Sequence, residues 1–194
     1  MKVARVLVAV VVATALAGPA HAAHEISMSQ YSGFNPSVVR HRAGATVTWE
    51  KTSGFHNVSS RQGMFRSGSP SSEPFTFSRT FSAGRYPYIC EVHPQTMTGV
   101  VRVKPRLAAR PAGRAFTVRW ATAATNTGSS FTVRYRVNDG RWRRWFAATT
   151  ADAAVFGRNR NPVRVVPGRT YSFRVRSRSG DNASSFSPRV TFRP

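Results

Sequence analysis

Apolar and polar residues alternate along short runs of the chain from residue 25 onwards. Two clear cases are 46–49 (Thr-Val-Thr-Trp) and 75–77 (Phe-Thr-Phe), where every second side chain is apolar. A period of two is that of a half-buried β-strand, and Gly, Pro, Ser and Asn separate the runs without a long helical period. The sequence therefore predicts an all-β fold. The core candidates of the first half are Ile26, Met28, Val38, Val47, Trp49, Val58, Phe75, Phe77, Phe81, Tyr88, Val101 and Val103.

A second series of strands is predicted after a break in composition. Pro105, Pro111 and Gly113 lie there among arginines and alanines, and proline stiffens a backbone that like charges extend. Strand-like runs then return, the longest of them in 131–137 and 168–177. We therefore predict four segments: a signal peptide (1–22), a first β-domain (23–103), a basic, proline-containing linker (104–114) and a second β-domain (115–194).

The first residues have the pattern of an exported protein. Lys2 and Arg5 precede the apolar run 6–17, and residues 20–22 (Ala-His-Ala) form a small-x-small cleavage site. Together these parts make a secretory signal peptide, removed after residue 22. We therefore expect a soluble mature protein outside the cytoplasm: extracellular, at the cell surface or periplasmic. No later stretch is long and apolar enough to cross a membrane.

The candidate chemistry is concentrated in one short stretch. Cys90, His93 and Met97 lie within eight residues, and His56 supplies a second imidazole upstream. One cysteine, two histidines and one methionine match a trigonal copper site with a weak axial thioether. Cys90 is the only cysteine, and in an exported protein an unpaired cysteine suggests a ligating or reactive thiol. The alternatives are a buried free thiol that acts as a small apolar side chain, and a solvated turn histidine at position 56.

A longer pattern surrounds these residues. It comprises 34–36 (Phe-Asn-Pro), 44–49, 56–58 (His-Asn-Val), 75–81, 84–93, and Met97 leading into 99–103. Across 25–103 this pattern resembles the plastocyanin- and pseudoazurin-like copper proteins, the cupredoxins. The resemblance implies a Greek-key β-sandwich that binds one copper ion at one end, in a type 1 (blue) site. The ligands it implies are His56, Cys90, His93 and Met97.

The same resemblance implies a function. Members of this family carry single electrons as their copper ion alternates between Cu(II) and Cu(I). They exchange these electrons with a redox partner protein, usually through the exposed edge of the downstream histidine, here His93. It also implies that Asn57 joins the two ligand loops by hydrogen bonding. The alternative function is copper binding for sequestration or delivery. The three residues between His93 and Met97 belong to a ligand loop whose length varies within the family. This variation tunes the site, so the resemblance does not fix its redox potential.

The second β-domain has a resemblance of its own. Trp120, Tyr135 and Tyr171, together with the closing run 185–188 (Ser-Phe-Ser-Pro), give a pattern similar to that of fibronectin type III modules. Tyr171 stands where that fold places its tyrosine corner. The resemblance implies a smaller, immunoglobulin-like β-sandwich that follows the first domain.

Positive charge is concentrated in this second domain. Fifteen arginines face three aspartates in 115–194, whereas eight basic residues face four acidic ones in 23–103. Such an excess favours an anionic cell-surface polymer, a membrane surface or an acidic protein as partner, bound in a salt-sensitive way. Arginines interleaved with aromatic residues also fit nucleic acid, which export disfavours. The alternative is a face that only keeps the protein in solution.

The sequence contains no recognisable catalytic constellation. It has no HExxH, no Ser-His-Asp set and no phosphate-binding glycine loop, and 115–194 contains neither histidine nor cysteine. Copper enzymes of related fold need further histidines, and besides His56 and His93 only His24 and His41 remain after the signal peptide. His41 is expected in a solvated loop, whereas His24 could chelate Cu(II) together with the new N-terminal amine. We therefore predict a protein that is not an enzyme.

Overall fold

The computed structural model describes residues 24–109, 115–126 and 128–194. The predicted signal peptide and residues 110–114 of the predicted linker lie outside the described residues. The strands are β1 (His24–Met28), β2 (Val38–Arg42), β3 (Ala45–Lys51), β4 (Ser59–Ser60), β5 (Phe75–Phe81), β6 (Gly84–Ile89), β7 (Thr98–Lys104), β8 (Arg106–Ala109), β9 (Phe116–Arg119), β10 (Ser129–Val137), β11 (Arg143–Thr149), β12 (Ala153–Phe156), β13 (Tyr171–Ser179), β14 (Asn182–Ala183) and β15 (Val190–Phe192). One four-residue helix, α1 (Ala123–Asn126), and a 3₁₀ turn, η1 (Arg158–Arg160), complete the elements. The all-β prediction is confirmed.

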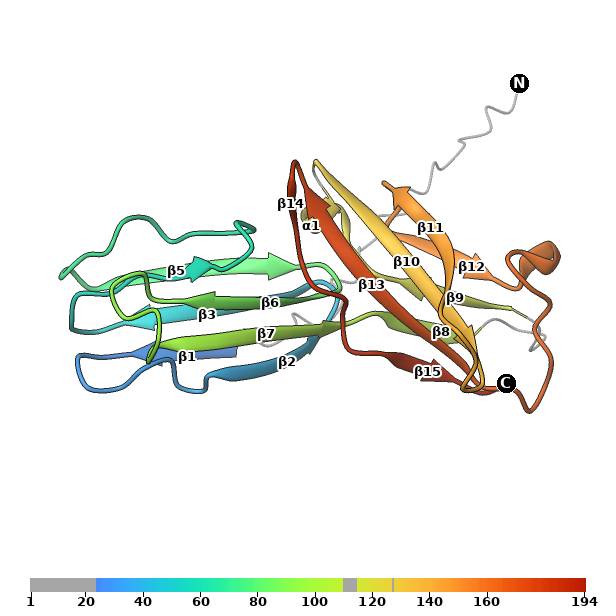
Figure 1. Cartoon of the computed structure of the whole chain (residues 1–194), viewed down its shortest axis with the longest axis horizontal. Helices are drawn as coiled ribbons and strands as arrows, with labels where there is room; N and C mark the ends of the chain where they lie inside the picture. Colours follow the sequence, from blue (N-terminus) through green and yellow to red (C-terminus); the bar gives the residue numbers. More distant parts are fainter. Residues whose placement is uncertain (1–23, 110–114, 127) are drawn as a thin grey trace, which may run out of the picture.

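Two sheets form the first β-domain, which occupies one end of the molecule (Figure 1). One has the order β1-β3-β5 and the other the order β2-β7-β6-β4, with β1–β3 and β2–β7 parallel and the remaining pairs antiparallel. Alternate residues of β3 are buried as predicted, so that Val47 and Trp49 are both fully buried while Thr46 and Thr48 lie on the outer face. The inner faces of the two sheets thus enclose one apolar core, as in a β-sandwich.

The second β-domain is also built from two sheets. One contains β11-β10-β13-β14 with β15 alongside β13, and the other has the order β12-β9-β8. At the start of β13, the Tyr171 hydroxyl accepts a hydrogen bond of 2.8 Å from the Val166 backbone N–H, the upstream contact expected of a tyrosine corner. The fibronectin type III identity of this domain stays a prediction.

Part of the predicted linker is strand. Arg106–Ala109 forms β8, which pairs antiparallel with β9 at the edge of a second-domain sheet. Backbone hydrogen bonds to β9 and a partly buried Leu107 hold this short stretch, although its sequence, Arg-Leu-Ala-Ala, has no strand-like alternation. The division of the chain into domains otherwise stays a prediction.

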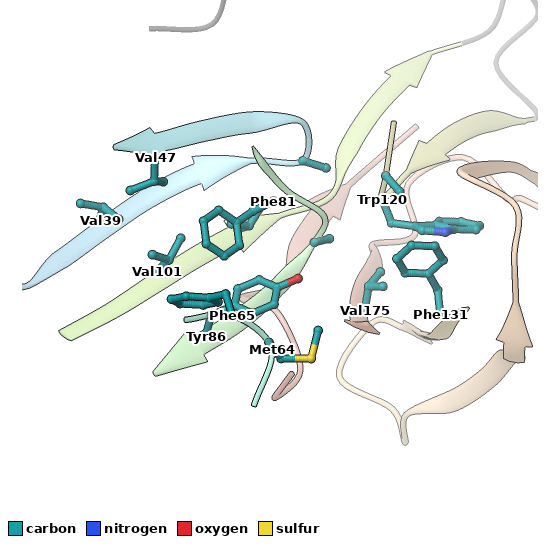
Figure 2. Packing of buried hydrophobic residues seen from close by; sticks show 14 of the residues in the cluster. Val39, Val47, Met64, Phe65, Phe81, Tyr86, Val101, Trp120, Phe131 and Val175 are labelled. Atoms are coloured by element: carbon teal, nitrogen blue, oxygen red, sulfur yellow. The ribbon is translucent and has the colours of Figure 1, made fainter. Parts of the chain in front are cut away.

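The two β-domains pack directly against each other. Phe81 and Tyr86 of the first domain and Trp120, Phe131 and Val175 of the second belong to one cluster of buried residues (Figure 2). Hydrogen bonds cross the same boundary: the Ser82 and Ser177 hydroxyls lie 2.7 Å apart, and the backbones of Arg85 and Ser185 exchange two bonds of 3.1 and 3.0 Å. These contacts all lie at the Gly84 end of β6. The opposite end of β6 leads into Cys90.

Within the described residues, no helix is both long and apolar enough to cross a membrane.

Candidate metal centre

The loop between β6 and β7 carries three of the four candidate ligands and is closed by its own backbone. Cys90 follows β6 directly, and its N–H donates a 3.0 Å hydrogen bond to the carbonyl of Met97. The N–H of Met97 donates in turn to the His93 carbonyl at 2.9 Å. Because these two bonds fold residues 90–97 into a tight turn, cysteine, histidine and methionine come to the same end of the sandwich.

His56 comes to this end from the connection between β3 and β4. Its backbone exchanges two hydrogen bonds with Ser71, of 3.2 and 3.1 Å, which fix the loop. Gly54, two residues earlier, has φ +79°, and a Cβ placed there would lie 2.5 Å from Nε2 of His56. Glycine is therefore required at position 54 both by its left-handed backbone and by the position of the His56 ring.

The donor atoms of His56, Cys90 and His93 have the spacing of a metal site. The Cys90 Sγ lies 3.6 Å from Nδ1 of His56 and 3.8 Å from Nδ1 of His93, and the three donors all lie within 4.8 Å of one another. Bonds of about 2.3 Å to sulfur and about 2.0 Å to imidazole nitrogen, at angles of about 110–120°, would separate such donors by about 3.5–3.7 Å. The three residues thus fit one first-row transition-metal ion between them.

Most of the centre is sheltered from solvent. Cys90 is fully buried, His56 and Met97 are each 4 % exposed, and His93 alone is exposed. His56, His93 and Met97 line a shallow hollow of about 320 Å³, whose other wall is residues 30–33. The side chain of Met97 lies under this wall, since a Cβ at Gly33 would be 3.8 Å from its Cγ. The centre therefore has one solvent-facing side, at the imidazole of His93.

The environment of His56 favours its neutral form. Burial is the largest cause that lowers its pKa below the usual value, and the nearby imidazole of His93 and the ammonium of Lys51 lower it further. The Ser29 backbone opposes this effect in part. A metal binds imidazole in its deprotonated form, so this environment keeps the nitrogen lone pair available.

A hydrogen-bonded clamp joins the two ligand loops. Asn57 is fully buried, and its side-chain oxygen accepts a 2.9 Å bond from the N–H of Glu91. Its amide nitrogen donates to the Gly68 carbonyl and to a Glu91 carboxylate oxygen, both at 2.9 Å. Arg66 holds the same carboxylate through two bonds of 2.9 and 2.6 Å. These bonds fix Asn57 and Glu91, the residues adjacent to His56 and Cys90, against each other.

The structure thus brings together the four residues proposed from the sequence. In the described part of the chain, His56, Cys90 and His93 are the only group of three His, Cys, Asp or Glu donors placed to share a metal ion. His41 is not among them. The expectation of a solvated loop at this position was wrong, because His41 is a partly buried residue of β2, opposite Val103 and at the far end of β7 from the site. The His24 side chain lies outside the described residues. The role of Asn57 was expected, whereas the contributions of Glu91 and Arg66 were not.

Comparison with known proteins gives likenesses among solved structures only. No family model matches the chain, and no curated protein matches it. Amicyanin from Paracoccus versutus (Thiobacillus versutus) is 26% identical, over 42% of this chain and 80% of its own, with a TM-score of 0.37. A purple cupredoxin from Nitrosopumilus maritimus is 26% identical, over 41% of this chain and 98% of its own, with a TM-score of 0.38. These structural neighbours are cupredoxins. Because both TM-scores lie below 0.5, any functional conclusion must come from the residues of the site itself.

Proposed function

We propose that this protein is an exported type 1 copper protein that carries single electrons through one copper ion. Its ligands are His56, Cys90, His93 and Met97. The observation that carries the proposal is the position of the Cys90 sulfur, 3.6 Å from Nδ1 of His56 and 3.8 Å from Nδ1 of His93. Of these residues only His93 is exposed to solvent. Thiolate and thioether sulfur favour Cu(I) and imidazole accepts either oxidation state, so this donor set suits an ion that changes charge.

Each residue has a distinct part in this proposal. Bound copper supplies a one-electron couple between Cu(II) and Cu(I). Cys90 provides a thiolate that metal binding keeps deprotonated, and its complete burial excludes water from the sulfur. The Asn57–Glu91 clamp holds the ligand loops in place, so that little rearrangement accompanies a change of charge. His93 is the exposed ligand and provides the contact for a redox partner protein.

Electron transfer is favoured over sequestration or delivery by the burial of the site. A protein that hands its metal to an acceptor needs ligands the acceptor can reach, and here only His93 is exposed while Cys90 and Met97 are buried. A catalytic role is disfavoured as well, because four protein ligands leave no position for a substrate. Replacement of Met97 by Leu separates the two copper functions. An electron carrier keeps its copper and shifts its potential, whereas a Cu(I) carrier that relies on the thioether loses affinity about tenfold or more.

Titration of the mature protein with Cu(II), followed by visible absorption and EPR, tests the proposal. We expect one equivalent of copper to produce an intense blue thiolate-to-copper band and a narrow hyperfine splitting, both absent in Cys90→Ser. Stoichiometric binding without the band would favour a carrier site. Failure of the protein to bind copper would refute the proposal.

The proposal includes a role for the second β-domain. Its excess of arginine over aspartate suits attachment to an anionic partner outside the cell, so that the copper domain is held near the surface where its redox partner works. Export itself rests on the signal-peptide pattern of residues 1–22.

A further inference from the structure

One face of the second β-domain is unusually rich in arginine. In β10 and β13 the residues Val133, Tyr135, Phe173 and Val175 are buried in the core. Because side chains alternate across a strand, the residues between them point to the opposite, outer face of the sheet. We call this surface the arginine face; it contains Arg134, Arg136, Arg144, Arg174, Arg176, Arg189 and Arg193.

Three of these arginines form a row across neighbouring strands. Arg134 of β10 is directly opposite Arg144 of β11 on one side and Arg174 of β13 on the other. The three strands run side by side along the second domain (Figure 1). Like charges directly opposite each other destabilise a sheet. Replacement of one arginine of the row by Thr or Glu would relieve this repulsion, so the pairing of the strands does not itself require three like charges.

Aromatic rings hold the guanidinium groups in place. The guanidinium carbon of Arg174 lies 4.3 Å from the ring centre of Trp142 and 4.6 Å from that of Phe186. Arg136 also packs on Trp142, at 5.1 Å, and Arg134 on Phe186, at 5.0 Å. Stacking of this kind limits the motion of the side chains. The arginine face is therefore organised before any ligand arrives.

The charge of these arginines is almost unopposed. Among the ion pairs of the described residues, only one involves the arginine face: Asp139 lies 3.6 Å from Arg136, and its side chain is fully exposed. Burial is the largest cause that lowers the pKa of Arg174, and the neighbouring positive charges of Arg134 and Arg136 lower it further.

A hollow of about 380 Å³ continues the face toward β15. Arg136, Arg189 and Arg193 line it together with Ser172 and Thr191, and Asp139 is the one acidic residue of the lining. Ser172 and Thr191 are opposite each other in β13 and β15, and their hydroxyl oxygens lie 3.2 Å apart. Guanidinium and hydroxyl donors around one concave surface are the groups that bind phosphate oxygens.

We propose that the arginine face binds an extracytoplasmic polymer that carries repeated phosphate groups. This inference rests on the anchoring role proposed above and assigns that role to the arginine face. Four adjacent strands at a spacing of about 4.8 Å make the face about 14 Å wide, too wide for one small anion to neutralise. Arginine forks bind phosphate through paired hydrogen bonds, which favours phosphate groups as the repeated anion. Nucleic acid fits less well, because guanidinium groups already cover the rings of Trp142 and Phe186 on which bases would stack.

Binding of inorganic polyphosphate to the full mature protein tests this proposal. Arg134, Arg136 and Arg174 are replaced together by Gln, and the matched control replaces Arg119, Arg158 and Arg160, three arginines outside the face, with the same change of charge. We expect the face variant to bind about tenfold more weakly or worse at 0.15 M salt. The magnitude of the slope of log K against log salt should be smaller by about 2 in the face variant than in the wild type, because each of the three lost phosphate contacts contributes about 0.7. The control should lose less than about threefold.

Equal losses in the two Gln variants would overturn the proposal, because net charge alone would then explain binding, and so would a wild-type protein that does not bind polyphosphate. A single-stranded DNA or a polyglutamate of matched charge that binds tighter than polyphosphate would assign the face to a different polymer. A triple Arg→Lys variant at the same positions guards against misfolding and should bind severalfold more weakly than wild type; equal binding would refute the role of the arginine forks. The Cys90→Ser protein should bind polyphosphate normally, so a failure of the copper proposal is recognised separately.

Discussion

Replacement of Asn57 by Ala tests whether the clamp between the ligand loops matters for both stability and copper binding. The substitution removes three hydrogen bonds of 2.9 Å, to the Gly68 carbonyl, the Glu91 carboxylate and the Glu91 N–H. A neutral intramolecular hydrogen bond contributes about 1 kcal/mol net, and a bond to a charged group more. The Glu91 carboxylate is one-third exposed, so water partly replaces its lost partner and we count this bond as about 1 kcal/mol as well. The expected loss is therefore about 3 kcal/mol in the free energy of unfolding.

Thermal unfolding of the metal-free protein measures this loss without the contribution of bound copper. At roughly 4–8 °C per kcal/mol for a domain of this size, the midpoint should fall by more than about 10 °C. Copper affinity should fall about 10- to 100-fold, as is typical when a group that orients ligands is removed. Asn182 is exposed, and its replacement by Ala serves as the control, which should change neither the unfolding midpoint nor the copper affinity. A shift of less than about 2 °C in Asn57→Ala, or unchanged copper affinity, would show that the loops hold their positions without the clamp.

Two further predictions follow from neighbouring residues. Gly54→Ala should lower copper affinity by about tenfold or more, since the added Cβ meets the His56 ring at 2.5 Å. In the control, Gly68→Ala, the added Cβ meets nothing within 4 Å, so that only backbone strain is expected. Equal copper affinities in the two variants would contradict this prediction. The pKa of Glu91 is lowered to about 2, chiefly by its hydrogen bonds from Arg66. Because this folded-state pKa lies below the unfolded value of about 4.5, the stabilisation by Glu91 is complete above pH 4.5 and is lost as the pH falls toward 2. Urea unfolding should therefore show the difference between wild type and Glu91→Gln shrinking across that range, and a difference independent of pH would refute the assignment.

Alternation predicted the strands well where polar and apolar residues are distinct, and failed where they are not. Val47 and Trp49 in β3 are buried as expected. In β2, by contrast, two valines are adjacent, and Val39 is 2 % exposed while the predicted Val38 is only half-buried. The pairing of β2 with β7 decides which valine faces the core, and no property of the two side chains reveals that register.

The segment 59–72 shows a different limit of the sequence. Its many serines and glycines are typical of a surface loop, yet Phe65 is 6 % exposed and Met64 8 %. Phe65 packs against Trp49 and Phe81, with ring centres 5.7 and 5.4 Å away. A single aromatic residue has no period, so a polar segment that inserts one side chain into a core looks like a loop until its partners are known.

The candidate ligands could be found from the sequence because three of them lie close together in it, whereas their supports could not. Cys90, His93 and Met97 occupy one turn. The remaining ligand had to be a second histidine, and the sequence offers few histidines to choose from. Arg66 and Glu91 are 25 residues apart and Asn57 and Glu91 are 34 apart, with ordinary polar side chains at each position. Only the fold, by placing the β3–β4 and β4–β5 connections against the end of β6, brings these groups into contact.

The arrangement of the two β-domains lets the proposed functions work without interfering. Arg85 in β6 contacts Ser185 of the second domain, whereas Ile89, at the other end of this six-residue strand, precedes the ligand loop. At about 3.3 Å per residue the proposed copper site lies more than about 13 Å along the strand from the domain boundary. A buried hydroxyl cluster at that boundary, where the Tyr86 oxygen lies 3.0 Å from that of Ser82 and 3.1 Å from that of Ser177, fixes the two domains together. Attachment through the second domain therefore leaves the exposed edge of His93 free at the opposite end of the first, where a redox partner can reach it.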